Sequence, residues 1–294
     1  MNAKQSPNIF SFNTDPQWLD AQHNNRLRVP DFMTYFERWQ KDSAIARQSQ
    51  PCQIDIAYGA GELEKLDVFP SQAKAKQSAP VLVFIHGGFW RSLDKADHSF
   101  VAPAFSSEAC VVIPNYPLCP HVTMEQLVLA QVQALVWVYR NIAKHGGDRN
   151  SITVIGHTAG GHLAAMMLAC QWQRVAKDLP TRLVKNAMSI AGLHDLEPLR
   201  HSPYIQGDLR LTKQQVRRCS PAYFPAPPGQ LIALCGEAES EEFRRHNRLI
   251  QQSWGQRCVS VCEEVPGANH FSVLEAMCKR GQRAHDLAHH LLFK

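Results

Sequence analysis

The sequence lacks the patterns that mark membrane-spanning and nucleic-acid-binding proteins. Its most apolar stretch, residues 127–138, is interrupted by Gln131 and Gln133, and it is too short to cross a bilayer. No Lys- or Arg-rich run occurs, and 31 Lys and Arg against 26 Asp and Glu leave a net charge of only +5, spread along the chain. We therefore expect no membrane association and no nucleic-acid partner.

Closely paired cysteines are also missing. The nine cysteines are an odd number and are scattered without a CxxC pair, in a chain of 294 residues that is long enough to bury a core without disulfides. Residues 1–6 run into polar sequence and lack the apolar segment of a signal peptide. These features predict free thiols and a cytoplasmic protein.

What the sequence does contain is a globular composition with a distinct N-terminal part. Hydrophobic residues make up 45% of the chain and charged residues 19%, which excludes a disordered protein. Residues 1–50 are polar, but they carry four aromatic residues at helical spacing, Phe32, Tyr35, Phe36 and Trp39. We predict that residues 1–50 form an N-terminal arm with a helix that docks on the main domain, residues 51–294.

The main domain alternates strand-like and helix-like segments. Alternating apolar residues on both sides of Gly59-Ala60-Gly61 predict an antiparallel hairpin. Apolar runs of strand length follow at 81–85, 110–113, 152–155, 187–190, 231–235 and 259–261, with helical segments between them. This order favours an α/β fold with a mostly parallel central sheet and helices on both faces. A proline-rich stretch at about 194–229 interrupts the alternation and predicts a small cap.

The strongest chemical motif is Gly156-His157-Thr158-Ala159-Gly160, where a buried strand meets a helix of small residues. This is the context of a nucleophile elbow, in which small flanking residues let a sharp turn expose the central side chain. The pattern is short, so a tight turn without chemistry is the competing interpretation.

A second motif, His86-Gly87-Gly88, follows the strand at 81–85. Two glycines at the end of a buried strand leave the backbone N–H groups of Gly87 and Gly88 free to bind a developing oxyanion, and the N–H of Ala159 in the elbow would add another donor. A flexible loop is the alternative for the glycine pair alone.

A general base is expected after the last strand, where His270 lies. An acid that orients this base should follow the strand at 231–235, and the loop there offers four carboxylates, Glu237, Glu239, Glu241 and Glu242. The residue pattern does not rank them, and Asp195 is a further candidate.

The spacing of His285 and His289 also fits a zinc-binding helix, although Asp286 stands where that motif has Glu. A solvent-facing helix explains the spacing better.

Together the motifs resemble those of α/β-hydrolases of the kynurenine formamidase (arylformamidase) and carboxylesterase-like group. The matching segments are 86–91, 156–163 and 269–271, and the likeness extends from about residue 53 to the C-terminus. The resemblance implies an α/β-hydrolase fold and metal-independent hydrolysis of small formamides or esters. It assigns the oxyanion hole to Gly87, Gly88 and Ala159 and the base to His270. It also favours Glu239 as the acid, since Glu239 precedes a Ser-x-x-Phe stretch.

The chain departs from this family at the elbow, where Thr158 stands in place of the nucleophilic serine. A β-branched residue is unfavourable at the backbone angles of an elbow, and its additional methyl group must fit beside the oxyanion hole. We therefore expect a hydrolase with weakened catalysis, in which Thr158 is the nucleophile. The alternative is a pseudoenzyme or small-molecule binding protein that retains the pocket. A cysteine hydrolase that uses Cys235 is disfavoured, because Cys235 lies inside a predicted strand.

Further expectations concern the ligands and assembly of the protein. The aromatic residues Phe89, Trp90 and Phe271 lie next to the catalytic motifs, so we predict that they line the pocket for a small-molecule acyl substrate. No metal and no organic cofactor is implied. A homodimer is left open by the sequence.

Overall fold

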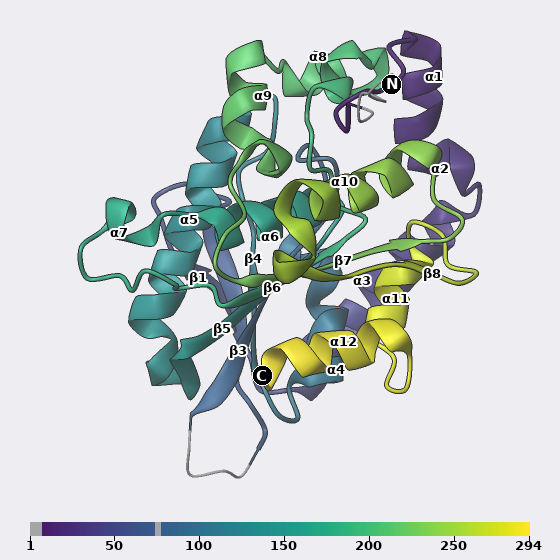
Figure 1. Cartoon of the computed structure of the whole chain (residues 1–294). Helices are drawn as coiled ribbons and strands as arrows, with labels where there is room; N and C mark the ends of the chain where they lie inside the picture. Colours follow the sequence, from purple (N-terminus) through teal and green to yellow (C-terminus); the bar gives the residue numbers. More distant parts are fainter. Residues whose placement is uncertain (1–7, 74–77) are drawn as a thin grey trace.

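The computed structural model describes residues 8–73 and 78–294, in which an eight-stranded sheet is covered by helices on both faces (Figure 1). In chain order the strands are β1 (Gln53–Ala57), β2 (Lys65–Phe69), β3 (Ala79–Ile85), β4 (Cys110–Pro114), β5 (Gly147–His157), β6 (Asn186–Ile190), β7 (Gln230–Gly236) and β8 (Val259–Val265). Residues 1–6, where the sequence shows no signal peptide, lie outside the described residues.

The order of strands across the sheet is β1-β2-β4-β3-β5-β6-β7-β8. β1 pairs antiparallel with β2, β2 pairs antiparallel with β4, and the remaining neighbours are parallel. The expected hairpin and the mostly parallel sheet are thus confirmed. β3 and β5 lie at the centre, and each residue from Val81 to Ile85 is fully buried, as the unbroken apolar run predicts. The parallel arrangement brings the carboxyl ends of β3, β5, β6, β7 and β8 to one edge.

Helices bury an apolar cluster against each face of the sheet. On one face pack α5 (Met124–Asn141), α6 (Ala159–Ala169) and α10 (Glu241–Cys258). On the other pack α3 (Phe32–Ser49), α4 (Ala102–Phe105), α11 (Ser272–Met277) and α12 (Arg283–Leu292). The start of α5 is fixed locally, because Thr123 and Gln126 form a capping box.

The N-terminal part folds as α1 (Pro16–His23), α2 (Asn25–Arg28) and α3. The aromatic face predicted over 32–39 forms in α3, where Trp39 stacks on Phe100 with ring centres 5.5 Å apart. Asp20 of α1 accepts hydrogen bonds from Ser202 and from the backbone N–H of Tyr204. The described part of the arm therefore lies against both the main sheet's helices and the predicted cap segment. The separation into an arm and a main domain stays a prediction.

The predicted cap segment, residues 194–229, consists of short helices, namely η3 (Pro198–His201), α8 (Pro203–Leu209), α9 (Lys213–Cys219) and η4 (Pro221–Tyr223). Figure 1 shows α8 beside α1, and α9 on the other side of α8, near α5. The remaining short elements are η1 (Lys95–Val101), η2 (Ile142–His145) and α7 (Trp172–Val175). The role of the segment as a cap stays a prediction.

Two further expectations concern the thiols and a membrane-spanning helix. All nine cysteines are free, as predicted. Across residues 8–73 and 78–294, none of the helices combines the length and the apolar character that a membrane crossing requires.

Candidate active site

The nucleophile elbow forms where β5 ends at His157 and α6 begins at Ala159. Thr158 between them has φ 51° and ψ −110°, a strained conformation for a β-branched residue. Glycine is required on both sides: a Cβ on Gly156 would overlap the carbonyl oxygen of Gly160, and a Cβ on Gly160 would overlap that of Ile85. The turn thus brings three backbone segments together and holds Thr158 above the sheet edge.

The side chain of Thr158 is 3% exposed and is packed against the glycine loop. Its methyl carbon Cγ2 lies so close to Gly87 that a Cβ on Gly87 would overlap it. Its hydroxyl oxygen Oγ1 is buried and has no hydrogen-bond partner among the described residues, so it is not bonded to His270. The methyl group therefore lies beside the predicted oxyanion site, while the hydroxyl is unpaired.

The proposed base and acid are directly bonded. His270, in the loop between β8 and α11, contacts Oε1 of Glu239 through Nδ1 at 2.9 Å, and both residues are 4% exposed. Because a carboxylate can only accept, Nδ1 carries the proton and Nε2 is left as an acceptor. Of the carboxylates that the sequence left open, Glu239 is the one that meets the base. Asp195 lies elsewhere and accepts a hydrogen bond from the hydroxyl of Tyr223.

The loop that carries His270 is held by bonds from three sides. Asn269 accepts the backbone N–H groups of Phe271 and Ser272 and donates to the hydroxyl of Tyr35 on α3 at 3.0 Å. His157 of the elbow contacts the carbonyl oxygen of His270 through Nε2 at 2.7 Å. Burial lowers the pKa of His157 well below its ordinary value, so its neutral ring donates its single N–H to that carbonyl.

The glycine loop provides unpaired donors near the elbow. Among the described residues, the backbone N–H groups of Gly87, Gly88 and Ala159 donate to no other group. Gly88 has φ +111°, and a Cβ there would overlap the carbonyl oxygen of Ser92, so only glycine allows this loop shape. Free amides on a loop of fixed shape are what an oxyanion hole requires.

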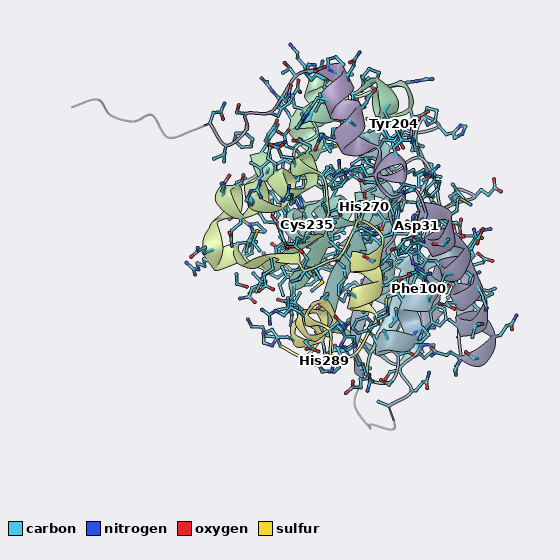
Figure 2. The ribbon with its side chains drawn as sticks, turned by 90° about the vertical axis from the view of Figure 1, so that its right-hand side faces the viewer. Asp31, Phe100, Tyr204, Cys235, His270 and His289 are labelled. Carbon is cyan, nitrogen blue, oxygen red and sulfur yellow. The ribbon has the colours of Figure 1, made fainter. Side chains whose placement is uncertain are left out.

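Thr158, His270 and Gly88 line one cavity, of about 40 Å³. Its other lining residues are Asn25, Arg26, Phe36, Trp39, Phe89, Arg91, Ser92, Leu93, His157, Tyr204 and Phe271. In Figure 2, His270 lies in the interior, with Tyr204 toward one end of the molecule and the arm beside it. The structure therefore brings Thr158, His270 and Gly88 to one cavity, whereas Gly87, Ala159 and Glu239 adjoin these residues without being among those that line it.

The prediction that Trp90 lines the pocket is wrong, whereas Phe89 and Phe271 do line it. Trp90 is fully buried in the core, and its indole N–H donates to Nδ1 of His162 at 3.2 Å. The lining residues that the sequence missed lie on α2, α3 and α8, in the loop at 91–93 and at His157. For the residues of α3, the sequence signal was the aromatic pattern of the arm, which predicted docking and not a pocket wall.

Sequence comparisons place these residues in a known family. A kynurenine formamidase from Danio rerio is 30% identical over 271 residues, 89% of each chain. Another from Drosophila melanogaster is 32% identical over 243 residues, 78% of each chain. The chain belongs to the kynurenine formamidase family. A family model described as BD-FAE also matches residues 66–202 of this family member.

The fold of this formamidase-family protein is shared by solved structures. A protein from Silicibacter sp. TM1040, 23% identical, superposes with a TM-score of 0.81 over 94% of this chain and 99% of that chain. The predicted α/β-hydrolase fold is confirmed, and the chain is a hydrolase of the formamide and ester type.

One cluster in this formamidase-family protein has the residue types of a metal site. Ligand atoms of His23, Glu242 and His246 lie within 4.8 Å of one another and are buried. However, Nδ1 of His246 accepts the backbone N–H of His194 at 3.1 Å, which leaves the proton on Nε2, the atom facing Glu242. Glu242 is already bound by Arg245, whose positive charge would repel a cation. The donor set does not fit a metal ion.

Proposed function

We propose that this family member hydrolyses a small aryl formamide or aryl ester slowly, with Thr158 as the nucleophile. The observation that carries the proposal is the 2.9 Å contact of Glu239 with His270, which lines the same cavity as Thr158. The kynurenine formamidase relatives support the formamide, and the aromatic lining supports an aryl group.

In the first step, Oγ1 of Thr158 attacks the carbonyl carbon while Nε2 of His270 takes the hydroxyl proton. The amides of Gly87, Gly88 and Ala159 bind the negative oxygen of the tetrahedral intermediate. The bond to the leaving amine or alcohol then breaks, and His270 returns the proton to it. In the second step, His270 deprotonates a water molecule, which attacks the acyl ester. The bond between the acyl carbon and Oγ1 then breaks, and His270 returns the proton to Oγ1, which releases the carboxylic acid and restores Thr158.

The proposed rate is low because the threonine is held in an unproductive rotamer. Oγ1 makes no hydrogen bond to His270, and the methyl group lies against Gly87. Attack requires a rotation about the Cα–Cβ bond that moves Oγ1 toward Nε2 and the methyl group into another part of the crowded turn. Misplacement of a nucleophile by about 1 Å costs on the order of a hundredfold in rate.

The absence of a hydrogen bond between Oγ1 of Thr158 and His270 also favours a second candidate function, a pseudoenzyme or binding protein that keeps the pocket. The two are separated by Thr158→Ser and Thr158→Ala variants, assayed with p-nitrophenyl acetate and N-formylkynurenine. Slow hydrolysis predicts that Thr158→Ser raises kcat/KM at least about tenfold, because the strain and the methyl group are removed. It also predicts that Thr158→Ala abolishes turnover.

The exposed Thr181→Ser is a matched control, since it makes the same chemical change outside the site and should leave the rate unaltered. His270→Ala should abolish the activity and so exclude a contaminating esterase. Equal, flat responses of the wild type and both Thr158 variants, with substrate still bound, would favour the binding protein.

A further inference from the structure

We propose that Arg26, on the N-terminal arm, selects substrates that carry a negative charge beyond their aromatic ring. The proposal rests on the proposed hydrolase function of the same cavity, and it names the residue that determines substrate specificity. It follows from the position of the arm, from the charges that line the cavity and from an unpaired polar group beside Arg26.

The N-terminal arm forms one wall of the cavity. Asn25 and Arg26 of α2 and Phe36 and Trp39 of α3 line it together with Thr158. Figure 2 shows the arm around Asp31 lying beside His270, in agreement with that lining. A substrate bound at Thr158 therefore meets side chains that lie more than a hundred residues away in the sequence.

The charges on this lining are of one sign. Two arginines, Arg26 and Arg91, face the cavity, and none of the lining residues is Asp or Glu. Arg91 is neutralised by an ion pair with Asp208 of α8. Arg26 makes no ion pair within residues 8–73 and 78–294, so its charge is left for a ligand.

The guanidinium of Arg26 is held in place by aromatic rings. Its central carbon lies 5.4 Å from the ring centre of Phe32 and 5.6 Å from that of Phe36. These cation–π contacts restrict the side chain without neutralising its charge. Since Arg26 is exposed while Thr158 is buried, the charge stands at the outer end of the cavity.

Asn25 adds an unpaired polar group to the same wall. Its side chain is 4% exposed, and its Nδ2 has no hydrogen-bond partner among the described residues. A buried amide donor without a partner is unfavourable, and a ligand that accepts a hydrogen bond removes the penalty. An anionic acceptor on the substrate would satisfy both Asn25 and its neighbour Arg26.

The class of substrate follows from these positions. The acyl group lies at Thr158, the aromatic ring packs against the rings of Phe89 and Phe271, and a carboxylate beyond the ring meets Arg26. A matched pair of substrates tests this arrangement: 4-acetoxybenzoate, which is an anion, and 4-acetoxybenzamide, its neutral isostere.

The test compares both substrates in the wild type, Arg26→Gln and Arg28→Gln. We expect Arg26→Gln to lower kcat/KM for 4-acetoxybenzoate about fivefold and to change that for 4-acetoxybenzamide less than about twofold. Arg28 is an exposed residue of the same short helix that does not line the cavity, so Arg28→Gln should change neither. Equal losses for both substrates, or no loss for either, would overturn the proposal.

A binding measurement keeps this test independent of turnover. Calorimetric titration with 4-hydroxybenzoate and 4-hydroxybenzamide should show tighter binding of the anion to the wild type and loss of that preference in Arg26→Gln. Asn25→Asp, which introduces a carboxylate of the same size, should weaken binding of the anion more than that of the amide. If the anion preference is seen without hydrolysis of either ester, the proposed function fails and the role of Arg26 stands. If both esters are hydrolysed without any preference for the anion, the role of Arg26 fails and the proposed function stands.

Discussion

His157 donates its Nε2 hydrogen to the carbonyl oxygen of His270 at 2.7 Å, so the elbow is bonded directly to the loop of the proposed base. The rings of the two histidines lie 4.9 Å apart between their centres. Because Thr158 follows His157 in the chain, this bond sets the position of the nucleophile relative to His270.

Replacing His157 tests that relationship. His157→Phe keeps the ring but removes the donor, and we expect kcat to fall about tenfold or more, because small displacements of a base are costly. His157→Gln, which can still donate to the carbonyl, should recover part of the loss. The measurement is the pH profile of kcat with p-nitrophenyl acetate, and a purely structural role would lower the amount of folded protein and leave the profile unchanged.

Glu239→Gln should lower kcat about 10²- to 10⁴-fold, the range typical of general-base catalysis. The amide would no longer stabilise the positive charge that forms on His270 during the reaction. Glu241→Gln is a matched control, since Glu241 is an exposed residue of the same segment. Similar rates for the two variants in a steady-state assay would show that Glu239 does not act with His270.

Gly87→Ala should be destabilising because the added Cβ overlaps the Thr158 methyl group. Overpacking of this kind costs about 1–3 kcal/mol. In a Thr158→Ser background the methyl group is absent, so the cost of Gly87→Ala should be smaller. Urea unfolding of the two single variants and the double variant measures this coupling, and additive effects would contradict the contact.

Acidification should destabilise the docking of α1. Burial lowers the pKa of His23 to about 4, so the folded protein holds this ring neutral. The unfolded chain takes up a proton near pH 6.5, so the contribution is present above that pH and is lost as the pH falls toward 4. The loss amounts to about 3 kcal/mol over this window.

His23→Phe should therefore show a weaker fall of the urea midpoint between pH 7 and 4.5 than the wild type does. His290→Gln, at an exposed position, is the control and should behave as the wild type. Parallel curves for all three proteins would contradict the assignment to His23.

Thiol alkylation should leave the hydrolysis rate unchanged. Cys235 is fully buried in β7, and burial raises the pKa of its thiol, so it is a poor nucleophile. Figure 2 shows Cys235 within the molecule. Treatment of the native protein with iodoacetamide, followed by the ester assay, checks this, and inactivation that tracks modification of Cys235 would revive a cysteine mechanism.

Several parts of the fold could be read from local sequence. The apolar run at 81–85 became the central strand β3, and Thr123 and Gln126, three residues apart, form the capping box that begins α5. Gly156 and Gly160 marked the elbow, because backbone contacts there leave no space for a Cβ. The capping box and the elbow depend on neighbours within a few residues. The buried strand shows itself as an unbroken run of apolar residues.

The identity of the acid was harder to predict. The residues of the loop after β7 offered four carboxylates, and resemblance to the family favoured Glu239. The contact of Glu239 with His270 joins residues 31 positions apart and depends on how two loops meet at the sheet edge. Trp90 was misplaced for a related reason, since its neighbour Phe89 faces the cavity while Trp90 is buried in the core.

The amino-acid sequence alone determined the strands, the elbow and the glycine loop, because chain stiffness, apolar periodicity and steric space around glycine are local properties. Only the tertiary structure decided that Arg26 faces the pocket of Thr158 and that the threonine methyl group rests on Gly87. Such contacts join segments far apart in the chain, and their geometry arises from packing the whole core, which no short pattern of residues encodes.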